Sequence, residues 1–321
     1  MKTAVFYNPK AGKGLPASLV MERIASFFQG DELLVADEQL LCPGLPTRMV
    51  NVPRGDNSYL GLLFSKVRAL AAAGVERFVC VGGDGTATYV RTALYASGRD
   101  IPILGVAAGT ANVGPIVSVT LQQLEGRRAS EAREVCYDGV AVLDEDHLVS
   151  LAFNDLVFGD TFLATLNGQT CNVSVRELLT RGELVPQRPS EDIVTPDFHV
   201  EVNGTALQPA LRDIRQIIIS SVAHERHYGR AVYGPIGKCD WSDKKGVIAL
   251  CDHIAVSYEE NDAGTGRFSA MQYLLFGPED EVVLHGFTPK ACLVCDGNPY
   301  LLNSQRVRVR YISNLVRTIT L

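Results

Sequence analysis

One aspartate surrounded by glycines follows an apolar segment near residue 80. Residues 81–86 read Val-Gly-Gly-Asp-Gly-Thr, between the apolar run 77–81 and a segment with a helical pattern. Glycine has no Cβ, so its backbone can adopt positive φ and approach a ligand closely. The N–H groups that open a helix also attract phosphate. The turn could therefore hold a phosphate, with Asp84 beside it to bind Mg²⁺ or accept a proton from a hydroxyl. The alternative is a tight strand-to-helix turn in which Asp84 caps the helix.

Two further glycine-containing loops strengthen the phosphate interpretation. Residues 8–14 (Asn-Pro-Lys-Ala-Gly-Lys-Gly) follow an apolar run at 3–7, and residues 107–114 follow another at 101–106. Strand-like and helix-like segments alternate through this part of the chain, which predicts a parallel sheet with helices on its faces. Ligands bind at the carboxyl ends of the strands of such sheets. All three loops are expected at that edge, which favours a phosphate site over a simple turn.

The elements that would position these loops divide the chain in two. Helices are expected at about 16–28, 59–73 and 86–96, and 31–37 is a candidate second strand. After residue 130 the segments are short, β-branched and alternating, with an Asn-Gly hairpin signal at 203–204. We expect an α/β nucleotide-binding domain over 1–125. A β-rich antiparallel sandwich should follow over 126–321, with one helix near 173–182, a cleft between the domains, and a last strand returning to the first.

Composition restricts the classes of function. The chain has 321 residues, 46% of them hydrophobic and 21% charged, and a net charge of −6. These values are typical of a globular protein, and the acidic balance predicts neither a nucleic-acid nor a membrane partner. Eight scattered cysteines favour free thiols in a reducing compartment, and the start of the chain does not resemble a signal peptide. We therefore expect a cytoplasmic protein.

The Gly-Gly-Asp-Gly-Thr motif after an apolar strand resembles the signature of the NAD kinase and diacylglycerol kinase superfamily. Residues 8–14 and 105–112 resemble the N-P-x-x-G-x-G and G-T-x-N loops of its lipid-kinase branch. Residues 152–158 resemble the L-N-E/D-V segment of NAD kinases, and 229–237 loosely resemble their G-S-T-A-Y…G-G-P-I segment. Asp296-Gly297 begins a C-terminal segment that resembles the D-G-x…V-x-V ending of both branches. This mixture resembles a divergent ATP-NAD kinase-like branch.

The resemblance implies an ATP- and Mg²⁺-dependent kinase that phosphorylates a hydroxyl group, with NAD as the leading acceptor. Asp84 would be the catalytic carboxylate, with Lys10 or Lys13 as a cation for the phosphates, and no protein-only metal site is expected. The implied ligand-binding residues are Gly82, Gly83, Gly85 and Thr86 for phosphates, Asn8, Gly12, Gly14, Thr110 and Asn112 for the nucleotide, and Asn154, Asp155, Arg230 and Tyr233 for the acceptor. Arg230 departs from the family pattern because it replaces the Ser-Thr pair. The family also implies a homodimer or homotetramer.

Several alternatives stay open. The loops at 8–14 and 109–112 also suit a lipid or polyol kinase, and the Arg230 departure allows a nucleotide-binding regulator without turnover. The Gly-x-Gly-x-x-Ala pattern at 12–17 is a degenerate match to a dinucleotide turn, with a proline that is unusual there. The Cys-x-x-Cys spacing at 292–295 has no second pair, so a buried strand is favoured over a metal or redox site.

Overall fold

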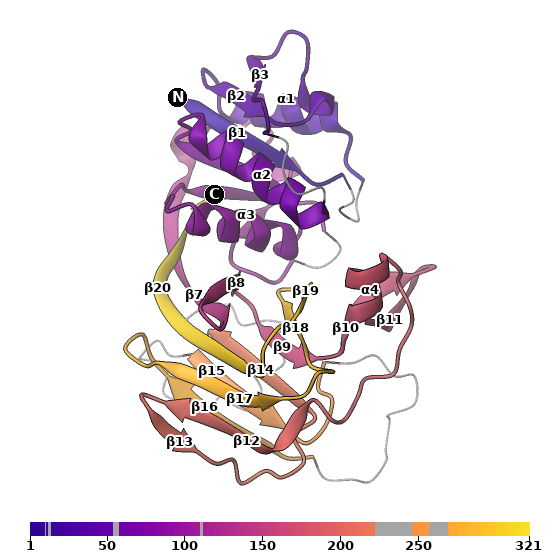
Figure 1. The fold of residues 1–321 in the computed structure, drawn as a ribbon. Coiled ribbons are helices and arrows are strands. Elements are labelled where there is room, and N and C mark those ends of the chain that lie inside the picture. Colours follow the sequence, from indigo (N-terminus) through magenta and orange to yellow (C-terminus); the bar gives the residue numbers. More distant parts are fainter. Residues whose placement is uncertain (10, 12–13, 54–57, 110–111, 222–245, 257–268) are drawn as a thin grey trace. The chain divides into compact units, whose positions relative to one another are not determined.

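The computed structural model describes residues 1–9, 11, 14–53, 58–109, 112–221, 246–256 and 269–321. The chain divides into two compact units (Figure 1). Unit 1 comprises Met1–Tyr137 and Asn314–Leu321, and unit 2 comprises Asp138–Ser313. The strands β7 (Arg133–Asp144) and β20 (Arg306–Thr320) each continue from one unit into the other.

Unit 1 is built on a parallel sheet. Its strands run in the spatial order β3-β2-β1-β4-β5, and β6 pairs in parallel with β5. Thr318 of β20 also pairs with Ile103 of β5. The bounds are β1 Lys2–Tyr7, β2 Glu32–Val35, β3 Thr47–Met49, β4 Arg77–Gly82, β5 Ile103–Ala107 and β6 Val117–Val119. Because β1 and β4 are neighbours whose following segments lead in different directions along the sheet, their carboxyl ends form a switch point, which is a common ligand position.

Helices cover both faces of this sheet. Helix α1 (Ala17–Phe27) packs on the face that carries Val5 and Val79. Helices α2 (Tyr59–Ala72) and α3 (Asp84–Ala96) contact each other as well as strands β1 and β4. Residues alternate between faces along a strand, so two helical layers explain why β1 and β4 are apolar almost throughout. The strand at 31–37 and the three helices are therefore confirmed, with boundaries shifted by a few residues.

Unit 2 consists mainly of antiparallel strands in two sheets. One sheet has the order β13-β12-β17-β20, with β7 pairing to β20 and β8; the other has the order β16-β15-β14-β9-β18-β19. A β10–β11 hairpin and helix α4 complete the described elements. Bounds not given elsewhere are β8 His147–Ala152, β9 Leu156–Gly159, β10 Thr161–Leu166, β11 Gln169–Ser174, α4 Val175–Arg181, β12 Val194–Val202, β13 Thr205–Leu207, β14 Gln216–Ser221, β15 Gly246–Cys251, β16 Met271–Phe276, β17 Val282–Phe287, β18 Cys292–Cys295 and β19 Asn298–Leu301.

The two sheets of unit 2 pack face to face through aromatic side chains. The rings of Phe158 on β9 and Phe287 on β17 stack with their centroids 4.7 Å apart. The hairpin signal at 203–204 is confirmed, because Asn203 and Gly204 both have positive φ and join β12 to β13. The α/β first part with a parallel sheet and the antiparallel second part are thus confirmed as the fold class.

The cysteines at 292–295 form strand β18 and are buried. Burial raises the pKa of the Cys292 thiol to about 11 and that of Cys251 to about 12, so both stay protonated and unreactive near neutral pH. This agrees with the buried-strand interpretation of the Cys-x-x-Cys spacing.

Candidate functional site

The turn that joins β4 to α3 places Asp84 at the first position of the helix. Gly83 is the N-cap residue, and no side chain caps the helix. Asp84 is therefore the first residue of the helix rather than its N-cap. Instead, Asp84 Oδ2 accepts hydrogen bonds from the backbone N–H groups of Val113 (2.7 Å) and Gly114 (2.9 Å). The carboxylate thus connects this turn to the loop that follows β5.

Glycine allows these two loops to approach each other closely. A Cβ on Gly109 would lie 2.8 Å from the Cα of Gly83 and 2.9 Å from Oδ1 of Asn112. A Cβ on Gly82 would lie 2.7 Å from both Cβ and Oγ1 of Thr86. Contacts this short require backbone or a packed side chain to move. Glycine is therefore needed at both positions for steric reasons.

The loop after β1 reaches the same edge of the sheet. Asn8 donates its backbone N–H to the carbonyl of Val81 (3.0 Å) and its side-chain Nδ2–H to Oγ1 of Thr86 (2.9 Å). Gly14, at the end of this loop, has φ +53°. Lys10, Gly12 and Lys13 lie outside the described residues, so the predicted phosphate cation does too.

Asn112 completes the group in unit 1. Its Nδ2 lies 3.4 Å from the carbonyl of Gly109, while its Oδ1 is buried and has no hydrogen-bond partner in the described part of the chain. Thr110 lies outside that part. The structure therefore brings Asn8, Gly82–Thr86, Gly109 and Asn112 together at the carboxyl edge of β1, β4 and β5.

A small pocket beside Asn8 was not expected from the sequence. It has a volume of about 130 Å³ and lies between Tyr7 and Asn8 on one side, Asp37 and Gln39 on another, and Lys66 of α2. Lys66 forms an ion pair with Asp37. No sequence motif marks this pocket because its walls come from three separate segments of the chain. Its mixed apolar and polar lining suits part of an organic ligand.

In unit 2, Asn154 and Asp155 lie between β8 and β9. Their backbone N–H groups and that of Phe153 all donate to the carboxylate of Asp296. Ser220 Oγ–H donates to the carbonyl oxygen of Asn154, and Asn154 as a whole is only 6% exposed. Asp155 is partly exposed. Asn154 and Asp155, two of the predicted acceptor-binding residues, are thus held by a fixed backbone. The other two, Arg230 and Tyr233, lie outside the described residues.

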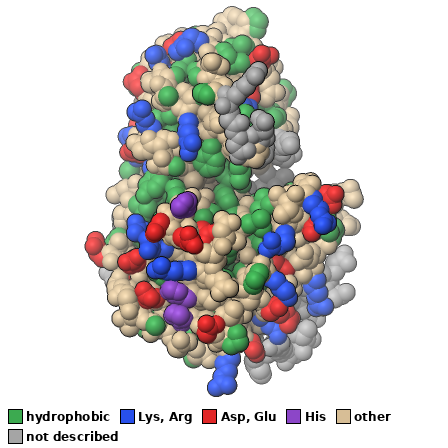
Figure 2. Space-filling view, viewed as in Figure 1, with side chains coloured by type: hydrophobic (Ala, Val, Ile, Leu, Met, Phe, Trp, Pro, Cys, Tyr) green, Lys and Arg blue, Asp and Glu red, His purple; other side chains and the backbone are tan. Residues whose placement is uncertain are grey.

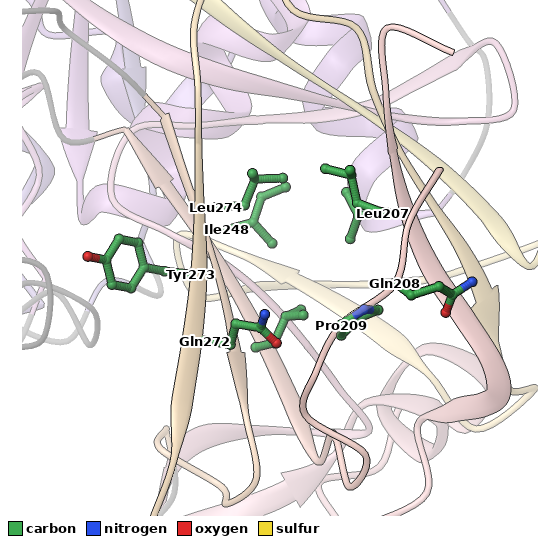
Figure 3. A pocket seen from close by; sticks show the side chains of 9 residues that line it. Leu207, Gln208, Pro209, Ile248, Gln272, Tyr273 and Leu274 are labelled. Atoms are coloured by element: carbon green, nitrogen blue, oxygen red, sulfur yellow. The ribbon is translucent and has the colours of Figure 1, made fainter. Parts of the chain in front are cut away.

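Unit 2 also contains an apolar pocket of about 120 Å³, between the edge strands of its two sheets. Figure 3 shows Leu207 and Pro209 facing Ile248, Gln272 and Leu274 across it. Nearby, Leu207 is 39% exposed and Tyr273 49% exposed, so apolar surface is accessible at the mouth. A cavity of this size and lining can take a small ring or a short alkyl group.

Charged side chains of both signs are interspersed on the face of the molecule in Figure 2. Ion pairs account for part of this pattern; Arg308, for example, lies 2.8 Å from Asp146 and 3.1 Å from Glu281. In the described part of the chain, no helix combines the length and apolar character needed to cross a membrane.

Comparison with known proteins identifies the fold. Residues 2–132 match the model of the diacylglycerol kinase catalytic domain. A solved structure, a putative diacylglycerol kinase from Bacillus anthracis, has a TM-score of 0.59 at 13% identity and covers 100% of this chain and 97% of its own. The chain has the fold of the NAD kinase and diacylglycerol kinase superfamily. The resemblance stated from the sequence is confirmed at that level, and the narrower likeness to an ATP-NAD kinase-like branch stays a prediction.

Two further proteins are similar to this chain over nearly its whole length. Yeast NADH kinase, solved in complex with NADH, shares the superfamily fold with a TM-score of 0.53 at 10% identity, covering 99% of this chain and 82% of its own. An uncharacterized protein of Archaeoglobus fulgidus is 28% identical over 326 residues, covering 99% of this chain and 98% of the relative. The similarity therefore includes both units rather than residues 2–132 alone.

Proposed function

We propose that the chain transfers the γ-phosphoryl group of ATP to a hydroxyl group, with NAD as the leading acceptor. The observation that carries this proposal is the convergence of three glycine-containing loops around Asp84 at one edge of the parallel sheet. Phosphoryl transfer depends mainly on positioning and on neutralising phosphate charge. Backbone N–H groups at the start of α3, next to the close loop approach that Gly82 and Gly109 allow, can provide both.

Asp84 is the residue that we place beside the reacting groups. A carboxylate there can accept the proton of the attacking hydroxyl. Because its Oδ2 is bound to two backbone N–H groups, the side chain has a fixed direction. Asp84 would therefore contact the acceptor hydroxyl while it stays hydrogen-bonded to the loop after β5.

Mg²⁺ fits this site. The described residues contain no group of three His, Cys, Asp or Glu side chains that could enclose a metal ion. Mg²⁺ does not need such a group, because it is commonly bound by one or two carboxylates together with substrate phosphates. Asp84 would provide that carboxylate, and the ion would neutralise phosphate charge.

The pocket beside Asn8 would hold the nucleoside part of ATP. Asn8 takes part in the glycine-loop group and also lines this pocket, so a nucleotide could place its phosphates at the turn and its base or ribose in the pocket. Asp37 and Gln39 supply hydrogen-bonding groups for a ribose or base edge.

Replacing Asn8 with alanine is expected to weaken ATP binding. The variant loses the hydrogen bond to Thr86 and a polar wall of the pocket. Loss of one hydrogen bond between the wall of the pocket and a bound nucleotide costs about 1–2 kcal/mol, or roughly five- to thirtyfold in affinity. Titration calorimetry with ATP measures this. Thr86→Ser, which keeps the hydroxyl, is the control and should bind ATP nearly as the wild type does; equal ATP affinity for Asn8→Ala and the wild type would contradict the role.

NAD is favoured as the acceptor because of Asn154 and Asp155. A carboxylate accepts hydrogen bonds from ribose hydroxyls, and the partly exposed Asp155 is held on a fixed backbone in unit 2. Unit 1 would bind ATP and unit 2 would bind the acceptor.

A lipid is the second candidate acceptor. The matching domain model is that of diacylglycerol kinases, and the apolar pocket in unit 2 has accessible apolar side chains at its mouth. An acyl chain or another apolar group could enter there.

A turnover assay on purified protein tests the function and separates the acceptors. The protein is incubated with Mg-ATP and NAD, and NADP is measured with a coupled dehydrogenase. A parallel assay uses diacylglycerol in mixed micelles. NADP formation without detergent supports the leading proposal, and detergent-dependent lipid phosphorylation supports the second. ATP or NAD that raises the melting temperature without product formation would identify a nucleotide-binding protein without kinase activity. No product and no thermal shift would contradict the proposed function.

A further inference from the structure

A single carboxylate binds three consecutive backbone N–H groups in unit 2. Oδ2 of Asp296 accepts from Phe153 (2.9 Å), and its Oδ1 accepts from Asn154 (2.8 Å) and Asp155 (3.1 Å). Successive N–H groups that converge in this way form a concave anion site. Asp296 is only 8% exposed, so these charge-assisted hydrogen bonds are shielded from water and are stronger than bonds between neutral groups.

Asp296 is itself held rigidly. It forms a two-residue hairpin turn with Gly297 between β18 and β19, with φ values of +47° and +82°. Its backbone N–H donates to the carbonyl of Asp155 (3.0 Å), and the neighbouring Cys295 pairs with Leu156 in the ladder of β18 and β9. The Asp-Gly turn therefore presents a fixed anion to residues 153–155.

These contacts fix the backbone dihedrals of Asn154 and Asp155, and so the direction of both side chains. Unit 2 also contains a buried aspartate that binds no predicted ligand-binding residue. Asp144 is 5% exposed and accepts from the backbone of Asn303 (2.6 Å) and from Ser304 Oγ. Neither Asn303 nor Ser304 is a predicted ligand-binding residue. Asp144 is therefore a matched control for burial and hydrogen bonding.

We propose that Asp296 is a positioning residue for the acceptor, acting through the backbone of residues 153–155. This rests on the proposed function, in which Asn154 and Asp155 contact the acceptor. Asp296 does not itself contact substrate. Its role is to hold Asn154 and Asp155 in one orientation before the acceptor binds, which reduces the conformational cost of binding.

Replacing Asp296 with asparagine removes this support with little change in volume. An amide has one acceptor oxygen instead of two, and its NH₂ group would face at least one backbone N–H. A backbone N–H group of residues 153–155 that is left buried without its acceptor is destabilised. The dihedrals of residues 153–155 would then be less restricted, while the loops that bind ATP belong to unit 1 and keep their contacts.

Steady-state kinetics and thermal melting of the full chain test this inference, with wild type, Asp296→Asn and Asp144→Asn compared. The acceptor is NAD, or the lipid if the turnover assay selects it. We expect Asp296→Asn to raise the KM of the acceptor about tenfold or more while the KM of ATP changes less than about twofold. Asp144→Asn should lower the melting temperature without changing the acceptor KM. An unchanged acceptor KM in Asp296→Asn, or an equal increase in Asp144→Asn, would overturn the inference.

Additional measurements decide the inference if the variant does not fold or if the wild type has no activity. If Asp296→Asn does not fold, Asp296→Glu replaces it, because the longer side chain keeps the charge but displaces the carboxylate, and the same difference between the two KM values is expected. A wild-type chain that phosphorylates no acceptor contradicts the proposed function as such. The inference is then decided by calorimetric titration with NAD, and it fails if NAD binds equally to wild type and Asp296→Asn or binds to neither.

Discussion

Replacing Asp84 with asparagine is expected to reduce turnover by about 10²–10⁴-fold while ATP still binds. Removing a general base typically costs a factor of this size. Asparagine keeps one oxygen that can accept the N–H groups of Val113 and Gly114, so the loop after β5 should stay in place. The variant thus removes the charge and the basicity and leaves the local contacts. The measurements are kcat with the identified acceptor and the dissociation constant of ATP by calorimetry.

Asp31→Asn is the control for this variant. Asp31 is also nearly buried in unit 1, at 8% exposure, and accepts from Thr3 Oγ1 (2.7 Å), but it directly precedes β2, at the opposite end of the strands from the glycine loops. It should lower stability and leave kcat nearly unchanged. Retained activity in Asp84→Asn would exclude Asp84 from the chemistry, and equal losses in both variants would indicate a general effect on folding.

Replacing Gly109 with alanine is expected to lower kcat by about a hundredfold. The new Cβ would lie 2.8 Å from the Cα of Gly83, so one of the two loops must move. A misplacement of about 1 Å at a reacting centre can cost about 10²-fold in rate. The strain should also lower the free energy of unfolding by about 1–3 kcal/mol. Kinetics and chemical denaturation of the same preparation measure both effects.

Gly277→Ala provides the matched control for this substitution. The nearest atom to a Cβ at Gly277 is Oδ2 of Asp280 at 3.7 Å, which is an ordinary contact. This variant should have the kcat of the wild type. A Gly109→Ala variant with wild-type kcat would show that the close approach of the two loops is not required for turnover.

The sequence predicted the parts of the fold that depend on local patterns. Alternating strand and helix signals in unit 1, and the position of the Gly-Gly-Asp-Gly-Thr turn after β4, follow from short-range periodicity and from glycine. The same applies to the Asn203-Gly204 hairpin, because its turn requires two residues with positive φ.

Long-range contacts could not be predicted in this way. The local pattern allows Asp84 to be either a catalytic group or a cap, whereas its hydrogen bonds to Val113 and Gly114 span about 30 residues of sequence. For Asp296 the sequence shows only a resemblance to the family's C-terminal segment, although its carboxylate binds residues more than 140 positions earlier. Such partners depend on which strands become neighbours, and no local pattern specifies that.

The most direct test of the central claim follows the γ-phosphate of ATP. Wild type and Asp84→Asn are incubated with Mg²⁺, γ-³²P-labelled ATP and the acceptor, and the labelled products are separated by chromatography. Wild type is expected to transfer label to the acceptor and Asp84→Asn to transfer almost none, although both bind ATP. Label that stays in ATP with wild type, or that reaches the acceptor equally with both proteins, would contradict the central claim.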